Sequence, residues 1–258
     1  MLRFRSLASG SSGNATLVEA RAGHGAPTRV LVDCGLGLRQ LAARLAAAGL
    51  ALDDIDAIFI THEHGDHVGC ALGLSSRHRI PLWTSAGTWA AIQDPRFEPI
   101  VHLAADGQDV AVGALQISPF TVPHDAREPL QLRCSDGARR LGILTDLGHV
   151  TPHALAQLAG CHALQLESNH DPALLARSSY PDFLKRRIAG QLGHLSNEQA
   201  AQALAPLRHA ELHCVVAAHL SERNNQPERA RAGFAQALGR AAHEVHVATR
   251  AGLDWLTV

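Results

Sequence analysis

The chain has 258 residues, of which 46% are hydrophobic and 18% are charged, a composition that supports a large core and excludes disordered, collagen-like and coiled-coil proteins. Its 23 basic and 24 acidic side chains give a formal charge of -1, which excludes a protein that is basic over its whole surface but allows a local basic patch. Histidine is unusually frequent, with 17 copies, and the positions of these histidines carry most of the functional information.

Short strands and two helices are expected in the first hundred residues. Leucines on one helical face predict a helix that begins at Leu38 and ends near Gly49, and a second helix is expected over 68–78. Alternating patterns and short apolar runs predict strands over 2–7, 15–19, 29–33, 57–60 and 81–84.

The remaining sequence is first rich in β structure and then alternates between helices and strands. The expected strands of the β-rich part are 100–102, 110–112, 115–122, 130–134 and 140–145. The expected helices that follow are 151–159, 171–189, 196–208 and 227–241, with short strands between them at 162–166, 213–218 and 244–248. Strand blocks with interleaved helices are typical of two packed sheets covered by helices. We therefore expect an α/β fold in one domain over 1–258, with two lobes of approximately 1–130 and 131–258.

The sequence also predicts the compartment. No segment approaches the roughly 18–20 apolar residues of a membrane span, and the N-terminal residues lack the apolar region of a signal peptide. The five cysteines are odd in number and contain no C-x-x-C pair, which favours reduced thiols in a cytoplasm. We expect a cytoplasmic protein without a membrane partner; the sequence does not define its oligomeric state.

The segment Thr61-His-Glu-His-Gly-Asp-His67 has the pattern of a metal site. It follows a predicted buried strand, so His62 and His64, two residues apart, can face the same side and bind one ion. Asp66 and His67 then begin a helix and can face a second ion. Three imidazoles and a carboxylate in six residues indicate metal binding rather than a run of solvated histidines.

This H-x-H-x-D-H segment resembles the metallo-β-lactamase superfamily. Further motifs of that superfamily follow in order: Asp33 in Val-Leu-Val-Asp-Cys-Gly, His124 in Val-Pro-His-Asp, Asp146 in Leu-Thr-Asp and His219 in Ala-Ala-His-Leu-Ser. The resemblance implies a four-layered αββα sandwich and two divalent ions. It assigns to the first ion His62, His64, His124 and Asp146, and to the second Asp66, His67, Asp146 and His219. It also implies that Asp33 orients a metal-bound histidine.

Four segments are similar to the YycJ/WalJ-like subgroup of this superfamily, and the similarity extends from about residue 4 to about 238. They are Leu-Ala-Ser-Gly-Ser-Ser-Gly-Asn at 7–14, Glu-Ser-Asn-His-Asp at 167–171, Gly-His-Leu-Ser-Asn at 193–197 and Ala-His-Leu-Ser-Glu-Arg-Asn-Asn at 218–225. This resemblance implies an exonuclease that acts on duplex DNA from the five-prime end.

Two metal ions about 3.5–4 Å apart can hold a bridging hydroxide, and a bound ion lowers the pKa of water to about 7. Mixed histidine and carboxylate ligands suit Zn(II) or Mn(II), and Fe(II) is also compatible. Redox members of the superfamily have glutamate at the position of His64, and β-lactamases proper usually have cysteine at the position of Asp146. The residues present at these two positions therefore favour a hydrolase over a redox enzyme, and a substrate other than a β-lactam.

His194 and Glu167 resemble a histidine and its orienting glutamate in the more distant RNase Z-like relatives. A histidine held by a carboxylate can donate a proton to the alkoxide that leaves a phosphodiester. His194 could instead cap a helix that starts near Ser196, and Ser196 with Gln199 forms a capping-box pattern independently of it. We expect a catalytic group of Asp66, Asp33, His194 and Glu167, in which Asp66 is also a metal ligand.

Several polar residues are candidate substrate contacts. The small-residue loop Ser9-Gly-Ser-Ser-Gly-Asn14 can bind an anion, although any turn uses such residues. The run Lys185-Arg186-Arg187 can line a phosphate track or form a solvated helix face. The predicted contacts are Ser9, Ser11, Ser12, Asn14, Arg186, Arg187, Arg223 and Asn224.

The predicted function is that of a metal-dependent DNA exonuclease. The alternatives are a phosphodiesterase for small cyclic nucleotides, a thioester or lactone hydrolase, and a non-catalytic binding protein, which the complete ligand set disfavours. A role in tRNA processing is also disfavoured, because only a short β-rich segment joins His124 to Asp146, where that activity needs a protruding arm. Eleven histidines, among them His24, match no ligand position.

Overall fold

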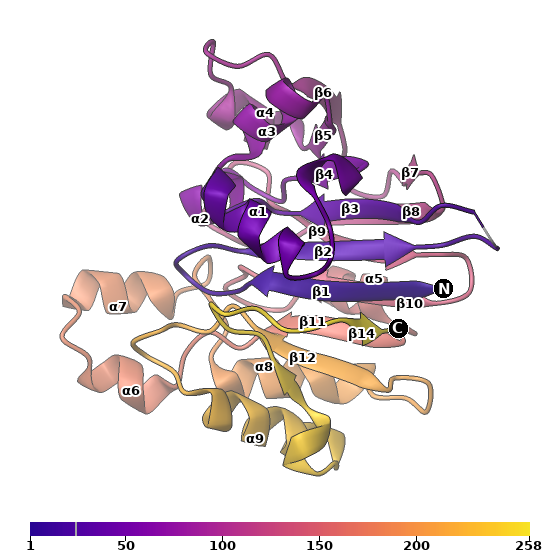
Figure 1. The fold of residues 1–258 in the computed structure, drawn as a ribbon. Helices are drawn as coiled ribbons and strands as arrows, with labels where there is room; N and C mark the ends of the chain where they lie inside the picture. The colour runs from indigo at the N-terminus through magenta and orange to yellow at the C-terminus, as the bar shows by residue number, and fades with distance from the viewer. Residues whose placement is uncertain (24) are drawn as a thin grey trace.

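Two seven-stranded mixed sheets form the centre of the molecule in the computed structural model, which describes residues 1–23 and 25–258 (Figure 1). His24 therefore lies outside the described residues. The first sheet has the order β14-β1-β2-β3-β4-β5-β6 and the second the order β13-β12-β11-β10-β9-β8-β7. In the first sheet the strands are β1 (Leu2–Ala8), β2 (Ala15–Ala20), β3 (Thr28–Val32), β4 (Ala57–Phe59), β5 (Pro81–Thr84), β6 (Ile100–Leu103) and β14 (Leu256–Thr257). In the second they are β7 (Val110–Val112), β8 (Leu115–Thr121), β9 (Leu130–Ser135), β10 (Arg140–Leu144), β11 (Ala163–Glu167), β12 (Cys214–Ala218) and β13 (His246–Val247).

Helices cover the outer face of each sheet, and a separate pair of helices protrudes. The first sheet carries α1 (Leu38–Ala46), α2 (Gly65–Val68), α3 (Ala71–His78) and α4 (Ala86–Ile92). The second carries α5 (Pro152–Leu158), α8 (Asn197–Leu204) and α9 (Pro227–Leu238). The protruding pair is α6 (Pro172–Arg177) and α7 (Asp182–Ile188), and short 3-10 turns are η1 (Leu52–Asp54), η2 (Ala205–Leu207) and η3 (Ala242–Glu244).

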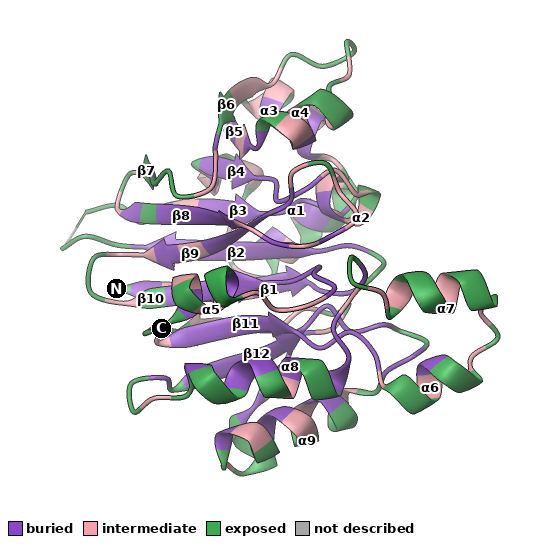
Figure 2. Ribbon diagram, turned by 180° about the vertical axis from the view of Figure 1, so that it is seen from behind, coloured by how far each residue is buried: buried purple, intermediate pink, exposed green. Residues whose placement is uncertain are grey.

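Three apolar clusters separate the four layers. The inner faces of the two sheets meet through side chains such as Phe4 and Phe59 of the first sheet and Leu132 of the second, all buried. Leu41 of α1 packs on the outer face of the first sheet, and Phe234 of α9 on that of the second. Figure 2 shows the consequence, with buried strands inside and helices exposed on their outer sides. The predicted αββα sandwich is thus confirmed.

The predicted helix over 171–189 is wrong in one respect, because the structure has two helices there. The first ends at Arg177, and α7 begins at Asp182 after Pro181. Proline has no backbone N–H and disfavours helical geometry in the residue before it, so a helix cannot continue through this point. The short helix α4 was not predicted; it begins where Ser85 accepts a hydrogen bond from the backbone N–H of Thr88.

The chain changes from the first sheet to the second between Leu103 and Val110, earlier than the predicted lobe boundary near residue 130, and β14 returns to the first sheet. The division into one domain with two lobes stays a prediction. Among the described residues, no helix is both long enough and apolar enough to cross a membrane.

A buried carboxylate links three strands of the first sheet, and we expect it to contribute to stability in a pH-dependent manner. Glu19 is fully buried, 2.8 Å from Nη2 of Arg3 and 2.7 Å from Nε of Arg29. Burial raises the pKa of Glu19, but the two guanidinium groups outweigh this effect and hold the pKa below its ordinary value. A carboxylate whose pKa is lower in the folded than in the unfolded protein stabilises the fold at pH values above the unfolded-state pKa. This contribution is lost as the pH falls through the folded-state pKa.

Glu19→Gln should therefore lower the free energy of unfolding at pH 7 by about 2–3 kcal/mol, as expected for hydrogen bonds to charged groups. The difference from the unsubstituted protein should shrink below about pH 4. Urea denaturation at several pH values measures it, with the exposed Glu98→Gln as control. An effect of Glu19→Gln that does not change with pH would contradict the assignment.

Candidate metal centre

The predicted site residues lie at one edge of the two sheets, where several strands end. Asp33 directly follows β3, and His62 comes shortly after β4, which is parallel to β3. Asp146 follows β10, Glu167 ends β11 and His219 follows β12, and these three strands are parallel as well. Because the carboxyl ends of parallel strands meet at the same edge, residues far apart in the sequence come together there.

The backbone at this edge is strained. Only four non-glycine residues in the described chain have a positive φ, and three of them belong to the site: Asp33 at 59°, Asp146 at 57° and His219 at 53°. This conformation is costly for residues with a side chain, and such strain concentrates at functional sites. Aspartate tolerates it better than most residues, because its short polar side chain can hydrogen-bond locally.

Three histidines form the first ligand group. The Nε2 atom of His62 lies 3.1 Å from Nδ1 of His64, and Nε2 of His124 lies 3.3 Å from the same Nδ1 atom. Each of the three offers a nitrogen within 4.8 Å of the others. Burial holds the pKa of His62 well below its ordinary value, so its imidazole is neutral and has a lone pair available for a metal ion.

A second ligand group lies beside the first, and Asp146 stands between them. Asp66, His67 and His219 offer atoms within 4.8 Å of one another, and Asp146 forms such a group with His62 and His67. The Nε2 atom of His67 lies 3.2 Å from Oδ2 of Asp146, and Nε2 of His219 lies 3.6 Å from Oδ2 of Asp66. All seven predicted ligands are therefore brought together at this edge.

The donor set fits divalent cations. The Oδ2 atom of Asp146 and the Nε2 atom of His219 are buried, and although His67 and Asp66 lie nearby, neither atom has a partner in hydrogen-bond geometry among the described residues. This arrangement is costly unless a cation satisfies the two atoms. Burial would lower the pKa of His219, but the surrounding carboxylates raise it to about 10, and they raise the pKa of His67 as well. A divalent ion at this position would replace those protons, since metal binding releases protons from its ligands.

Asp33 and Asn14 support the second ligand group from behind. Oδ2 of Asp33 lies 2.8 Å from Nδ1 of His67, and the other oxygen of Asp33 accepts hydrogen bonds from the backbone N–H and the hydroxyl of Thr61. Nδ2 of Asn14 lies 3.1 Å from Nε2 of His67 and 3.3 Å from Oδ2 of Asp66. The Asp33 carboxylate thus fixes the orientation of the His67 ring and leaves its Nε2 atom facing the cluster.

Asp33→Asn should weaken metal binding by about 10-fold to 100-fold, as expected when a carboxylate that orients a metal-bound histidine is lost. Asparagine tolerates the positive φ of this position, so the substitution changes the charge and little of the backbone. Metal affinity is measured by competition with a chelating dye, with the exposed Asp56→Asn as control. Equal affinities of both variants and the unsubstituted protein would remove this role from Asp33.

Glu167 holds two histidines at once. Its Oε1 atom lies 2.9 Å from Nδ1 of His194 and 3.1 Å from Nδ1 of His219, and its Oε2 atom accepts a hydrogen bond from the backbone N–H of Leu195. Burial raises the pKa of Glu167, but its contacts with His194 and His219 lower it to about 2. In turn, the Glu167 carboxylate overcomes the effect of burial on His194 and raises the pKa of that imidazole.

Comparison with known proteins identifies the family. Residues 28–226 match the family model described as "Beta-lactamase superfamily domain". The chain is 34% identical to "Exodeoxyribonuclease YycJ" of Bacillus anthracis, covering 92% of this chain and 89% of the relative, and 32% identical to "Exodeoxyribonuclease WalJ" of Streptococcus pneumoniae, covering 93% and 89%. The chain belongs to the metallo-β-lactamase superfamily.

Solved structures share the fold of this chain. The metallo-beta-lactamase fold protein YhfI from Bacillus subtilis has a TM-score of 0.72 at 14% identity, and covers 100% of both chains. Zn(2+)-bound PqqB from Methylobacterium extorquens also has a TM-score of 0.72, at 17% identity, and covers 99% of this chain and 100% of the other. The family and the histidine and aspartate clusters together make this chain a metal-dependent hydrolase that binds divalent metal.

His194 does not serve as a helix cap in this superfamily member. Ser196 caps α8: its hydroxyl accepts a hydrogen bond from the backbone N–H of Gln199, whose side chain accepts one from the N–H of Ser196. The predicted capping box is thus confirmed, and the side chain of His194 is left to its contact with Glu167.

A cavity of about 360 Å³ opens onto the metal ligands. Asp125 and Arg187, whose contact was not predicted from the sequence, both line this cavity, and Oδ2 of Asp125 lies 2.6 Å from Nε of Arg187. The Oδ1 atom of Asp125 lies 3.7 Å from Nε2 of His64 and 3.5 Å from Nε2 of His124. Asp125 directly follows a predicted ligand in the sequence, and this adjacency was the available signal. The pair fixes α7 at the mouth of the metal cavity.

The predicted substrate contacts divide into exposed and buried residues. Ser11 and Arg187 line the metal cavity, and Ser12, Arg186 and Arg223 are exposed. The other three contacts are buried: Ser9, Asn14 and Asn224.

Each buried residue of this set has a partner inside the protein. The hydroxyl of Ser9 accepts a hydrogen bond from the backbone N–H of His219, Asn14 contacts His67, and Asn224 bonds to Ser221. Their burial argues against direct contact with a substrate, and we assign them to the support of the surrounding loops.

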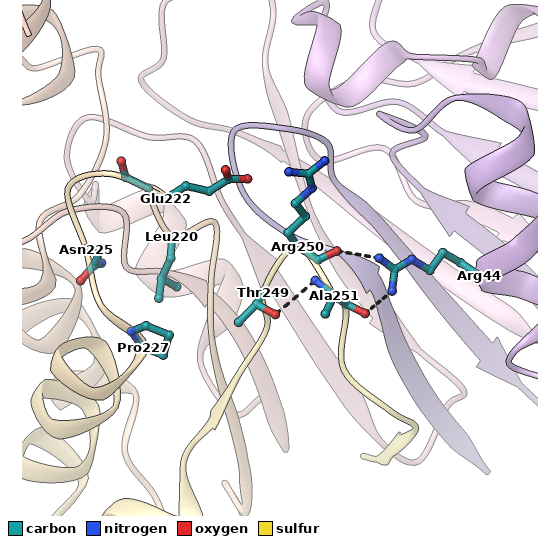
Figure 3. A pocket seen from close by; sticks show the side chains of 9 residues that line it. Arg44, Leu220, Glu222, Asn225, Pro227, Thr249, Arg250 and Ala251 are labelled. Carbon is teal, nitrogen blue, oxygen red and sulfur yellow. Dashed lines mark hydrogen bonds between the residues drawn. The ribbon is translucent and has the colours of Figure 1, made fainter.

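A second cavity, of about 510 Å³, is lined in part by the loop that follows His219 (Figure 3). The guanidinium of Arg44 closes one side of it by donating hydrogen bonds to the backbone carbonyls of Arg250 and Ala251. The charged groups that line it are Arg44, Glu222 and Arg250. None of the groups of metal-ligating side chains found among the described residues lies in its lining.

Proposed function

We propose that this superfamily member is an exonuclease that hydrolyses duplex DNA from the five-prime end. The observation that carries the proposal is the contact of Glu167 with His194 beside the ligand groups, because this pair provides an acid for the leaving alkoxide of a phosphodiester. The names of the relatives, both exodeoxyribonucleases, support the choice of DNA.

Two divalent ions, Zn(II) or Mn(II) with Fe(II) also possible, would supply a water-derived nucleophile at neutral pH when bound. His62, His64 and His124 would hold one ion, Asp66, His67 and His219 the other, and Asp146 would contact both. Since these ligands come from both sheets, the sandwich itself sets their spacing.

His194 would move the proton. Its Nδ1 atom faces Glu167, and its side chain lines the metal cavity and is 23% exposed. The Glu167 carboxylate raises the pKa of His194, so a larger fraction of the imidazole is protonated near neutral pH. The ring can then donate from Nε2 to the departing oxygen of the DNA.

The formal charge of -1 requires that DNA binding be local. Arg186 and Arg187 on α7 and Arg223 on the neighbouring loop provide exposed positive charge near the metal cavity. Neutralising DNA phosphates releases counterions, so the apparent affinity should fall with salt. All five cysteines are free, which supports our proposal of a cytoplasmic location.

The test incubates the metal-loaded protein with blunt duplex DNA, single-stranded DNA and bis(p-nitrophenyl) phosphate, each end of the DNA being labelled in turn. We expect stepwise loss of nucleotides from the five-prime end of the duplex and a rate that falls with salt. The His64→Ala variant should be inactive on every substrate. Full activity of this variant would contradict the metal assignment.

The alternative is a phosphodiesterase for a small substrate such as a cyclic nucleotide, and the near-neutral charge of the chain favours it. A thioester or lactone hydrolase of the same fold would use the metal ligands but would not need the acid at His194. DNA hydrolysis that is insensitive to moderate salt, beside rapid turnover of a small phosphodiester, would support the small-substrate function over the exonuclease.

A further inference from the structure

Helix α7 is poorly explained by its role in the fold. None of its residues is buried, and Leu175 is the one buried residue of α6. Figure 1 shows both helices protruding from the sandwich, and Figure 2 shows them exposed on most of their surface. Few apolar contacts therefore hold α6 and α7 in place. Polar contacts contribute instead: Lys185 donates a hydrogen bond to the backbone carbonyl of Ala176, and Arg187 pairs with Asp125.

The same helix borders the metal cavity. Leu184, Arg187 and Ile188 line that cavity together with His194 and the metal ligands. Leu192, which is 52% exposed, lies next to the cavity residue Gly193. An element without a structural core at the mouth of a catalytic cavity is in position to contact a substrate there.

Phe183 is the unexplained residue of α7. At 67% exposure it is the most exposed of the large hydrophobic side chains in the described chain. Residues three and four apart share a helix face, so Phe183 lies on the same side of α7 as Arg186 and Arg187. It is roughly 6 Å from Arg187 along the helix axis, one turn away from the mouth of the metal cavity.

The surrounding charge indicates what covers this ring. Arg186 is exposed on α7, and the guanidinium of Arg223 lies 5.8 Å from the centre of the ring of Tyr180, which comes two residues before α7 begins. Aromatic rings among arginines suit a single-stranded nucleic acid, whose bases stack on the rings and whose phosphates contact the cations. An apolar protein surface would leave the arginines without partners.

A stacking residue also meets a requirement of the proposed reaction. Four of the proposed metal ligands, His64, Asp66, Asp146 and His219, line a cavity of about 360 Å³, and the proposed reaction would bring a terminal phosphodiester to them with its nucleotide released from the duplex stack. The adjoining base then loses its neighbours in the stack, at a cost that enzymes acting on extruded bases offset with aromatic contacts.

We propose that Phe183 stacks on the base next to the scissile phosphodiester and so holds the unpaired end of the DNA strand at the metal cavity. This inference rests on the proposed function. It goes beyond that function by naming the ligand of α7, an unstacked terminal nucleobase, and by making Phe183 a binding residue.

The test compares Phe183→Ala, Phe183→Leu and Phe183→Tyr in the metal-loaded full chain. Substrates are duplexes with a normal terminal nucleotide and duplexes with an abasic sugar in its place. Leu103→Ala, on β6 and 58% exposed, is the matched control for loss of an exposed apolar side chain. A stopped-flow experiment also follows the fluorescence of a terminal aminopurine before the first cleavage, since stacking on the ring quenches it.

The alanine and leucine variants should lose about 5-fold to 100-fold in kcat/KM on the normal duplex, the range expected for one base–aromatic stack. They should also lose the fluorescence quench, whereas the tyrosine variant and Leu103→Ala should retain both. The abasic duplex should be cut slowly by the unsubstituted protein and equally slowly by the variants.

Normal activity of Phe183→Leu would overturn the stacking role, because leucine keeps the apolar surface without the ring. Equal sensitivity of the normal and abasic duplexes to Phe183→Ala would overturn it as well. In both cases the unsubstituted protein still cuts DNA and the proposed function stands. If the unsubstituted protein hydrolyses bis(p-nitrophenyl) phosphate but neither binds nor cuts DNA, the exonuclease function fails, and the stacking role fails with it.

Discussion

Replacing Asp146 by asparagine should reduce hydrolysis of both DNA and bis(p-nitrophenyl) phosphate by at least about a thousandfold, equivalent to roughly 4 kcal/mol of transition-state stabilisation. Asp146 is nearly completely buried between the two ligand groups, and its Oδ2 atom has no hydrogen-bond partner among the described residues. An amide oxygen at this position carries no charge and could not compensate the two proposed cations. Because asparagine adopts the positive φ of this position readily, the loss should not reflect a refolded loop.

Metal content gives a second measurement of the same substitution. Equilibrium dialysis followed by elemental analysis should show fewer ions per chain in Asp146→Asn than in the unsubstituted protein. Circular dichroism should show the same secondary structure in both. The control is Asp109→Asn, at an exposed position that belongs neither to the candidate ligand groups nor to the lining of the metal cavity. Unchanged metal content and unchanged rates in Asp146→Asn would contradict a shared ligand at this position.

The residues that the structure brings together as candidate metal ligands could be found in the sequence because they follow strand ends. His62, His64 and His67 lie within six residues directly after a short apolar run, so local sequence shows both the strand and the chemistry at its end. Asp146 and His219 likewise follow buried apolar strands, β10 and β12. Resemblance to a known superfamily then related the separate motifs to one another, which spacing alone could not do.

Other features of the site depend on contacts between distant segments, and local sequence patterns do not predict them. The contact of Asp125 with Arg187 joins residues 62 positions apart, and neither residue has a neighbouring pattern that indicates its partner. The burial of Asn224 is equally non-local, since it follows from the packing of the loop after His219 against the sandwich. The exposure of Phe183 could not be predicted either, because an apolar residue in a helical pattern normally faces a core.

The His194→Ala substitution should separate two stages of the reaction that Asp146→Asn affects together. We expect hydrolysis of DNA to fall by about 100-fold to 10,000-fold, the usual contribution of a positioned general acid. DNA loses an alkoxide, a strong base that needs a proton as it departs. Hydrolysis of bis(p-nitrophenyl) phosphate should fall by less than about tenfold, because the nitrophenolate it releases is a weak base and departs without a proton.

The pH profile and chemical rescue make this test specific to His194. Since the Glu167 carboxylate raises the pKa of His194, the acid form persists to a higher pH than in a free imidazole, and DNA hydrolysis should decline as the pH rises through that raised pKa. The decline should be absent in His194→Ala, and imidazole added to the buffer should restore part of the lost rate. His243→Ala, at an exposed histidine on η3, is the matched control. Equal losses on both substrates would contradict the role of His194 as a proton donor. They would mean instead that His194 acts through the metal ligands, since Glu167 contacts both His194 and His219.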